Sequence, residues 1–208
     1  MSRRNDRLRF DGCIAGLGTA AGTRLVVGHW PRSPYGPVSD VMVESAAGER
    51  LLLASTAELG SFVAATYLFD RVHITPVAVS VAGATWTVTA DPLQLSFTTG
   101  RRGSLGLLLR AVPPPLARSP WWVRLVDLPA RWMLPGVRTV GSAGGGRREW
   151  YGAQDLHPIS TARATFDGRN LGPLAAVDPP VRFGFGSTPR APALVRVTTT
   201  VEVPRDRN

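Results

Sequence analysis

The stretch ALVRVTTTVEV, residues 193–203, contains the clearest fold signal of the chain. Valine or threonine occupies every second position from Val195 to Val203, and polar side chains such as Arg196 and Glu202 stand between them. Because successive side chains of a β-strand point to opposite faces, this alternation predicts a strand with one apolar face and one polar face.

Similar short alternating runs, separated by turn residues such as Gly, Pro and Asp, occur on both sides of a central stretch. We predict strands at residues 7–14, 23–30, 38–45, 50–54, 137–142, 147–154, 159–167 and 182–185, and a three-strand meander at 71–99. Consecutive strands joined by turns exclude a parallel, doubly wound fold. One apolar face per strand must be covered. We therefore predict a mainly β (β-rich α+β) fold, an antiparallel closed or nearly closed barrel of the lipocalin kind. A two-sheet β-sandwich is the alternative.

Two helical segments interrupt the strands. Ser55 and Glu58 are spaced as a capping box, which predicts one short helix at about residues 56–67, with Ser55 as its cap. Residues 101–138, RRGSLGLLLRAVPPPLARSPWWVRLVDLPARWMLPGVR, predict a helical excursion at about 103–135. We expect a single domain, residues 1–208, with this excursion inside it.

The composition excludes several classes of enzyme. All 24 basic residues are arginine, so Schiff-base enzymes and P-loop nucleotide hydrolases that depend on lysine are excluded. The net charge of +9 favours anionic partners, but the arginines are scattered along the chain, which argues against nucleic acid.

The single cysteine, Cys13, permits no internal disulfide and is expected to be a buried, inert thiol. Arg3 and Arg4 resemble a twin-arginine export signal, but Asp6 and Asp11 interrupt it, so we expect a cytoplasmic protein.

The tryptophans of the excursion form the first candidate site. Trp121 and Trp122 stand among leucine, valine and arginine at helical spacing. Such a helix packs on a sheet with its arginines reaching outward, covers an apolar ligand cavity, or rests on a membrane surface. Exposed together, these rings would form a large apolar patch, so we expect the sheet, a ligand, a partner or lipid to cover them.

A second candidate site follows in GSAGGGRREWYGAQD, residues 141–155. Its charged and aromatic side chains can recognise a ligand. A histidine near two carboxylates could instead perform acid–base catalysis, although such a group also occurs by chance in a protein of this size. We assign ligand binding to Arg147, Arg148, Trp150 and Tyr151, and we name His157, Glu149 and Asp155 as catalytic candidates. The three histidines share no metal-ligand spacing, so we expect neither a metal nor a cofactor.

The segments GHWPRSPYGP (28–37), GVRTVGSAGGGRREWYGA (136–153) and PPVRFGFGSTP (179–189) resemble a group of conserved proteins of high-GC bacteria. No activity is assigned to that group, so the resemblance implies no functional residues. The predicted barrel is also acetoacetate-decarboxylase-like in shape. The absence of lysine removes that family's chemistry, so the fold alone is comparable.

These observations favour a binding protein over an enzyme. We expect a small apolar or amphipathic ligand inside the barrel, with the excursion as its lid and Arg147 or Arg148 meeting an anionic group. The alternatives are an enzyme with an acid–base site near His157 and Glu149, and an arginine-driven binder of nucleic acid or anionic membrane through residues 103–135. The sequence does not predict an oligomeric state.

Overall fold

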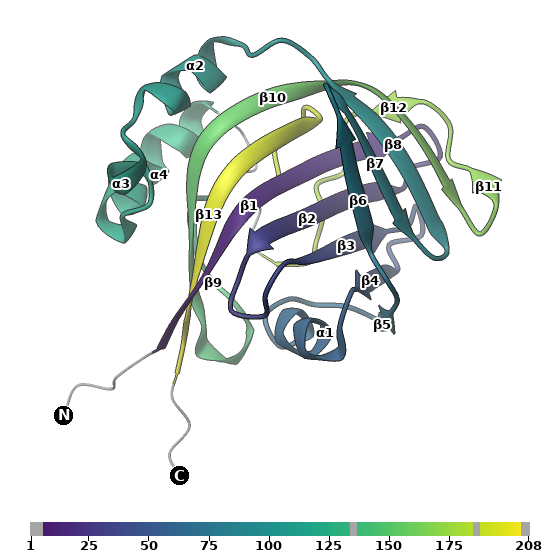
Figure 1. The fold of residues 1–208 in the computed structure, drawn as a ribbon, viewed down its shortest axis with the longest axis horizontal. Helices are drawn as coiled ribbons and strands as arrows, with labels where there is room; N and C mark the ends of the chain where they lie inside the picture. The colour runs from purple at the N-terminus through teal and green to yellow at the C-terminus, as the bar shows by residue number, and fades with distance from the viewer. Residues whose placement is uncertain (1–5, 134–136, 185–187, 205–208) are drawn as a thin grey trace.

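The computed structural model describes residues 6–133, 137–184 and 188–204, and most of this chain belongs to one curved β-sheet (Figure 1). The main strands are β1 (Asp6–Thr19), β2 (Arg24–Arg32), β3 (Val38–Glu44), β4 (Arg50–Ala54), β5 (Arg71–Ile74), β6 (Ala78–Ala82), β7 (Thr85–Ala90), β8 (Leu93–Thr99), β10 (Arg148–Phe166) and β13 (Ala193–Val203). Three short strands join the margins: β9 (Val140–Ser142), β11 (Arg169–Asn170) and β12 (Leu174–Ala175). The described part of the predicted strand at 182–185 is not a strand.

The sheet is nearly closed. Its order is β5-β4-β3-β2-β1-β13-β10-β8-β7-β6, so β5 and β6 are the two edges along this path. The prediction of a mainly β, nearly closed antiparallel barrel is confirmed. One edge departs from the antiparallel rule, because β4 and β5 are parallel. The helix α1 (Ala57–Ala64) lies between these two strands in sequence, and a crossover of this kind allows parallel neighbours.

The long strand β10 folds the sheet over itself. Its first half pairs with β13 and its second half pairs with β8. The register shifts between Ala153 and Asp155, and again between Ile159 and Thr161. Such bulges bend a strand and increase its twist. As a result β6, β7 and β8 cross the face of β1, β2 and β3 (Figure 1).

Side chains from both halves fill the space between them. This inner face brings leucine and valine of β1 to β4 against leucine, valine and phenylalanine of β7 and β8, and burial of each contributes roughly 1.5–3 kcal/mol. The best-buried members are Leu17, Leu25, Val41, Leu53, Val88, Leu93, Leu95 and Phe97. The protein's own core therefore fills the space between the two halves where these side chains meet, and openings of about 340 and 620 Å³ border this core.

The opposite, outer face of the sheet is covered by helices. The helix α1 places Leu59 and Val63 on this face beside Trp30 and Leu52. Its cap differs from the sequence prediction. The hydroxyl of Thr56 accepts the hydrogen bond from the Leu59 amide at 3.2 Å.

Ser55 instead accepts from the backbone amide of Ser39 at 3.4 Å, because it still belongs to the turn that leaves β4. The N-cap was thus predicted one residue too early, the predicted capping box of Ser55 and Glu58 does not form the cap, and the helix is shorter than the expected 56–67.

The predicted excursion is helical and lies beside the first half of β10 (Figure 1). It consists of α2 (Ser104–Ala111), α3 (Pro114–Ala117) and α4 (Pro120–Met133). Asp127 fixes α4 to the following strand by accepting from the Thr139 amide and hydroxyl, both at 2.8 Å. Among the helices that the structure describes, none is long and apolar enough to cross a membrane.

Candidate functional site

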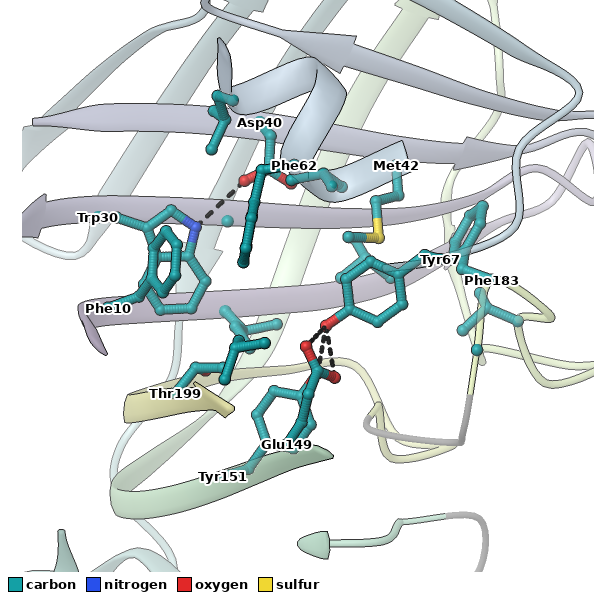
Figure 2. A pocket seen from close by; sticks show the side chains of 18 residues that line it. Phe10, Trp30, Asp40, Met42, Phe62, Tyr67, Glu149, Tyr151, Phe183 and Thr199 are labelled. Atoms are coloured by element: carbon teal, nitrogen blue, oxygen red, sulfur yellow. Dashed lines mark hydrogen bonds between the residues drawn. The ribbon is translucent and has the colours of Figure 1, made fainter. Parts of the chain in front are cut away.

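Two cavities lie on the outer face of the sheet, and the side chains of Ile14 and Tyr151 contribute to both. The first, of about 350 Å³, lies between α2, α4 and the sheet, and we call it the helix-covered cavity. The second, of about 60 Å³, is lined by α1 and by β1, β2, β3, β10 and β13. We call it the carboxylate pocket, because two buried carboxyl groups line it (Figure 2).

The wall of the helix-covered cavity is almost entirely apolar. The helices contribute aliphatic and aromatic side chains, and the sheet contributes Ile14, Val195 and Val197. Gly16 allows Thr188 to pack closely against β1, because a Cβ at position 16 would lie 1.9 Å from Cγ2 of Thr188. The helical side chains are Leu105, Leu108 and Leu109 of α2 and Trp122, Val123 and Val126 of α4.

In the carboxylate pocket, Asp40 of β3 is 3% exposed and Glu149 of β10 is 1% exposed. Trp30 Nε1 donates to Asp40 Oδ1 at 3.1 Å (Figure 2). Gly28, on the neighbouring strand, leaves room for this pair. A Cβ at Gly28 would lie 2.6 Å from both Asp40 Oδ1 and Trp30 Nε1, so a side chain there would force the pair apart.

Glu149 belongs to a network with two tyrosines. The Tyr67 hydroxyl lies 3.0 Å from each carboxylate oxygen of Glu149, and the Tyr151 hydroxyl donates to Oε2 at 3.2 Å. The two hydroxyl oxygens are 2.6 Å apart. Tyr67 therefore joins the turn after α1 to the middle of the sheet.

Burial controls the protonation of both carboxyl groups. It raises the pKa of Asp40 to about 7, and the hydrogen bond from Trp30 offsets only part of this rise. Burial also raises the pKa of Glu149 to about 7, against the hydrogen bonds from Tyr67 and Tyr151 and the charge of Arg147. A carboxyl group with a pKa near 7 can both accept and donate a proton at neutral pH, as general acid–base chemistry requires.

The four residues predicted to bind a ligand within 147–151 do not form one site, because each lies in a different environment. Arg147 lies beside the carboxylate pocket, where Nη1 donates to the Phe62 carbonyl at 2.8 Å and to the Thr66 hydroxyl. Arg148 is exposed, and its side chain lines neither cavity. Trp150 is buried beneath the guanidinium groups of Arg7 and Arg124, with ring centroids 5.8 and 5.4 Å from the two Cζ atoms. Of these four residues, only Tyr151 lines both cavities.

The three catalytic candidates do not meet at one place. Arg102 donates to both oxygens of Asp155, at 2.7 and 2.8 Å, and thereby lowers the pKa of that carboxyl. His157 Nε2 lies 3.7 Å from Asp155 Oδ2, and its Nδ1 lies 3.1 Å from the Gly100 carbonyl. Asp155 and His157 are therefore neighbours. Glu149 is on the outer face of β10, and His157, which pairs with Leu194 of the inner core, is on the other face.

The two adjacent tryptophans of α4 differ in environment. Trp122 lines the helix-covered cavity, whereas Trp121 is 60% exposed. Their rings meet edge to face with centroids 6.1 Å apart. Leu107, Leu108 and Leu125 are also largely exposed, so the covering helices present an apolar outer surface.

Sequence reasoning missed Asp40, Trp30 and Tyr67 as site residues. Asp40 was the one of these that the sequence could have indicated, because an acidic residue within an apolar strand is unusual. Burial raises the pKa of the Cys13 thiol to about 11, so this cysteine is a poor nucleophile. No cluster of three or more histidine, cysteine, aspartate or glutamate side chains with metal-binding geometry occurs in the described residues.

No family model matches the sequence, and no curated protein matches it. Among solved structures, the fold is similar to an acetoacetate decarboxylase from Legionella pneumophila, with a TM-score of 0.43 and 9% identity over 95% of this chain and 85% of that one. It is also similar to an AttH-type protein from Nitrosomonas europaea, with a TM-score of 0.33 and 10% identity over 97% of this chain and 52% of that one. Similarities this distant carry no activity over to this chain.

Proposed function

We propose that the protein binds an apolar or amphipathic small molecule in the helix-covered cavity. The observation that carries the proposal is a cavity of about 350 Å³ bordered mainly by apolar side chains of α2, α4 and the sheet. Small-molecule sites are typically apolar cavities of about 300–1,000 Å³. Apolar side chains around an empty space lose packing contacts, and an apolar ligand restores them.

The covering helices are attached to the sheet by polar contacts, which can open to admit a ligand. Polar contacts hold them to the sheet: Asp127 of α4 binds Thr139, and Arg102, just before α2, binds Asp155. Contacts of this kind can separate and re-form in water without exposing the inner core, which belongs to other strands. The cover can therefore open while the sheet stays folded.

Native mass spectrometry of the protein purified from its own host tests the proposal directly. We expect a discrete additional mass of an organic molecule that disappears when the protein is denatured. A clean mass of the bare chain, together with no binding of the apolar fluorophore N-phenyl-1-naphthylamine, would contradict the proposal.

Replacing Trp122 by alanine is expected to weaken binding of N-phenyl-1-naphthylamine about tenfold, because the ligand loses one aromatic wall of its cavity. Fluorescence titration measures the dissociation constants. Trp121→Ala is the matched control, since it removes the same side chain one position earlier, outside the cavity. Equal losses in the two variants would show that the helix surface, and not the cavity, binds the probe.

A second candidate function is contact with a membrane surface through the same helices. Leu107, Leu108, Trp121 and Leu125 are each between 57% and 60% exposed, and Arg110 and Arg124 lie on the same helices. Exposed apolar and basic side chains on one helical surface are typical of peripheral binding to anionic lipid. Contact of this kind would also bring a lipid-like ligand to the cavity.

Leu125→Glu is expected to reduce co-sedimentation with phosphatidylglycerol vesicles severalfold, because a carboxylate resists both the apolar interface and the anionic headgroups. Leu68→Glu is the control, since Leu68 is 62% exposed and belongs to the turn after α1. If neither variant, or both equally, lose vesicle binding, the helices are not the membrane contact.

A further inference from the structure

The carboxylate pocket contains two buried acids, Asp40 and Glu149, and no cationic side chain of the described residues lies within ion-pair distance of either. Arg147 is the nearest basic residue that acts on Glu149, but its guanidinium is bound to Phe62 and Thr66. Removing a carboxylate from water costs free energy that is recovered only when a cation or a proton neutralises it.

A third polar group in the pocket also lacks a protein partner. Thr199 of β13 is 5% exposed, and its hydroxyl has no hydrogen-bond partner among the residues that the structure describes. Its side chain lines the pocket together with both acids (Figure 2). Buried hydroxyl groups nearly always have a partner, so an unpaired one indicates a group that the protein itself does not supply.

Aromatic rings form much of the remaining wall. Phe10 packs against Trp30 with centroids 5.8 Å apart and against Phe62 at 5.4 Å, and Tyr67 and Tyr151 border Glu149. An aromatic ring attracts a cation that lies against its face, so an aromatic wall is compatible with a cationic ligand. Aromatic faces, two carboxylates and a free hydroxyl are together complementary to a cation with N–H donors.

We propose that the carboxylate pocket binds the ammonium group of a small amine. The small volume of about 60 Å³ favours a ligand of only a few non-hydrogen atoms. Methylammonium, with two non-hydrogen atoms, matches this volume. A primary ammonium has three N–H donors, and Asp40, Glu149 and Thr199 are the acceptors that the pocket wall offers to such donors. This site is separate from the helix-covered cavity, so the inference holds whether or not that cavity binds a ligand.

The protonation of the pocket gives the site a pH dependence. Burial and the hydrogen bond from Trp30 determine the pKa of Asp40. The pKa of Glu149 depends on burial, on the hydrogen bonds from Tyr67 and Tyr151, and on the charge of Arg147. Since the pKa of both acids is about 7, the carboxylates are charged at pH 8 and protonated at pH 5.5. Ammonium binding is therefore expected at pH 8 and at least tenfold weaker at pH 5.5.

The experiment is a thermal-unfolding titration with methylammonium chloride at pH 8, with sodium chloride keeping the ionic strength constant. A ligand of two heavy atoms binds at best on the order of 10 mM, so about 100 mM raises Tm by about 3 °C. Methanol, which has the same size but no charge, and formate, an anion, are expected to leave Tm unchanged. Tetramethylammonium, which has a charge but no N–H donor, is expected to have a smaller effect than methylammonium.

Asp40→Asn and Glu149→Gln preserve the shape of each side chain and remove its charge, so each variant is expected to lose the methylammonium effect. Glu58→Gln, which alters an exposed carboxylate on α1, is expected to retain it. The proposal is overturned if methylammonium fails to raise Tm at pH 8. It is also overturned if methanol or formate acts equally well, or if both pocket variants respond like the wild type.

Discussion

The variant Asp40→Asn is expected to be more stable than the wild type by about 4 kcal/mol at pH 8, because one pKa unit corresponds to ~1.4 kcal/mol and burial raises this pKa from 3.8 to about 7. The wild-type protein must hold a buried carboxylate at pH 8. Asparagine is neutral at every pH, and its carbonyl oxygen can still accept the hydrogen bond from Trp30.

The sign of the pH dependence follows from the raised pKa. Between about pH 4 and pH 7 the folded state keeps the Asp40 proton, while the unfolded chain has lost it. The unfolded state therefore binds fewer protons, and the free energy of unfolding falls as pH rises through this window. Below about pH 4 both states are protonated, so the variant and the wild type are expected to converge.

Urea unfolding of both proteins between pH 4 and pH 8 measures this difference. Asp70→Asn is an informative control, because hydrogen bonds from Arg50 lower the pKa of Asp70 to about 2. That variant is expected to change stability in the opposite direction, losing stability above about pH 4. A stability difference between Asp40→Asn and the wild type that does not vary with pH would rule out a buried ionisable Asp40.

The second large effect is expected at Glu44. Glu44→Gln should lower the free energy of unfolding by about 3 kcal/mol, the cost of leaving a buried charge without its counter-ion. Arg24 is 3% exposed, Glu44 is wholly buried, and Arg24 Nη2 lies 2.9 Å from Glu44 Oε1. Arg182 adds a backbone hydrogen bond to Oε2 at 2.8 Å and a side-chain contact to Oε1 at 3.0 Å.

Chemical denaturation at pH 7 measures this loss, and the double variant Arg24→Met with Glu44→Leu provides the control. Removing both charges leaves no unpaired buried ion, so the double variant is expected to recover most of the stability. Arg182 stays solvated because its side chain is mostly exposed. A loss in Glu44→Gln no greater than that of the exposed Glu58→Gln would contradict a structural role for this ion pair.

Asp40 and Glu44 illustrate how partners decide the state of a buried acid. They lie four residues apart on β3, so they share the outer face, and both are almost fully buried. Burial alone would raise the pKa of Glu44, but the hydrogen bonds from Arg182 and the charge of Arg24 outweigh it and lower this pKa. Asp40 has only Trp30, so its pKa rises. The contrast agrees with the proposal that the carboxylate pocket binds a cation.

Local patterns predicted most of the secondary structure. The alternation of residues 193–203 identified β13, and the proline and leucine spacing of 101–138 identified the helical excursion. The cap of α1 was predicted one residue too early because two neighbouring residues have the same capping chemistry. Ser55 and Thr56 both cap helices well, and the preceding strand decides which hydroxyl is available.

The candidate site was harder to predict, because polar side chains on a strand usually face water. The alternation in β3 separates Val41 and Val43 from Asp40 and Glu44, as expected for a sheet with one solvated face. In this protein α1 and the loop at 181–184 cover that second face, so its acids are buried. Similarly, nothing local distinguishes Trp121 from Trp122, because the direction of each ring relative to the sheet depends on how α4 docks.

The sequence by itself determined the strands, the helical excursion and the absence of lysine chemistry, since each depends on neighbouring residues or on composition. The tertiary structure alone decided that Asp40, Glu149 and Thr199, from β3, β10 and β13, line one pocket, and that the helices form an apolar cavity against the outer face of the sheet. Side-chain alternation in a strand repeats every two residues, so it can be recognised from neighbouring residues alone. The meeting of strands more than 100 residues apart depends on register and on the bends of β10, to which many distant contacts contribute.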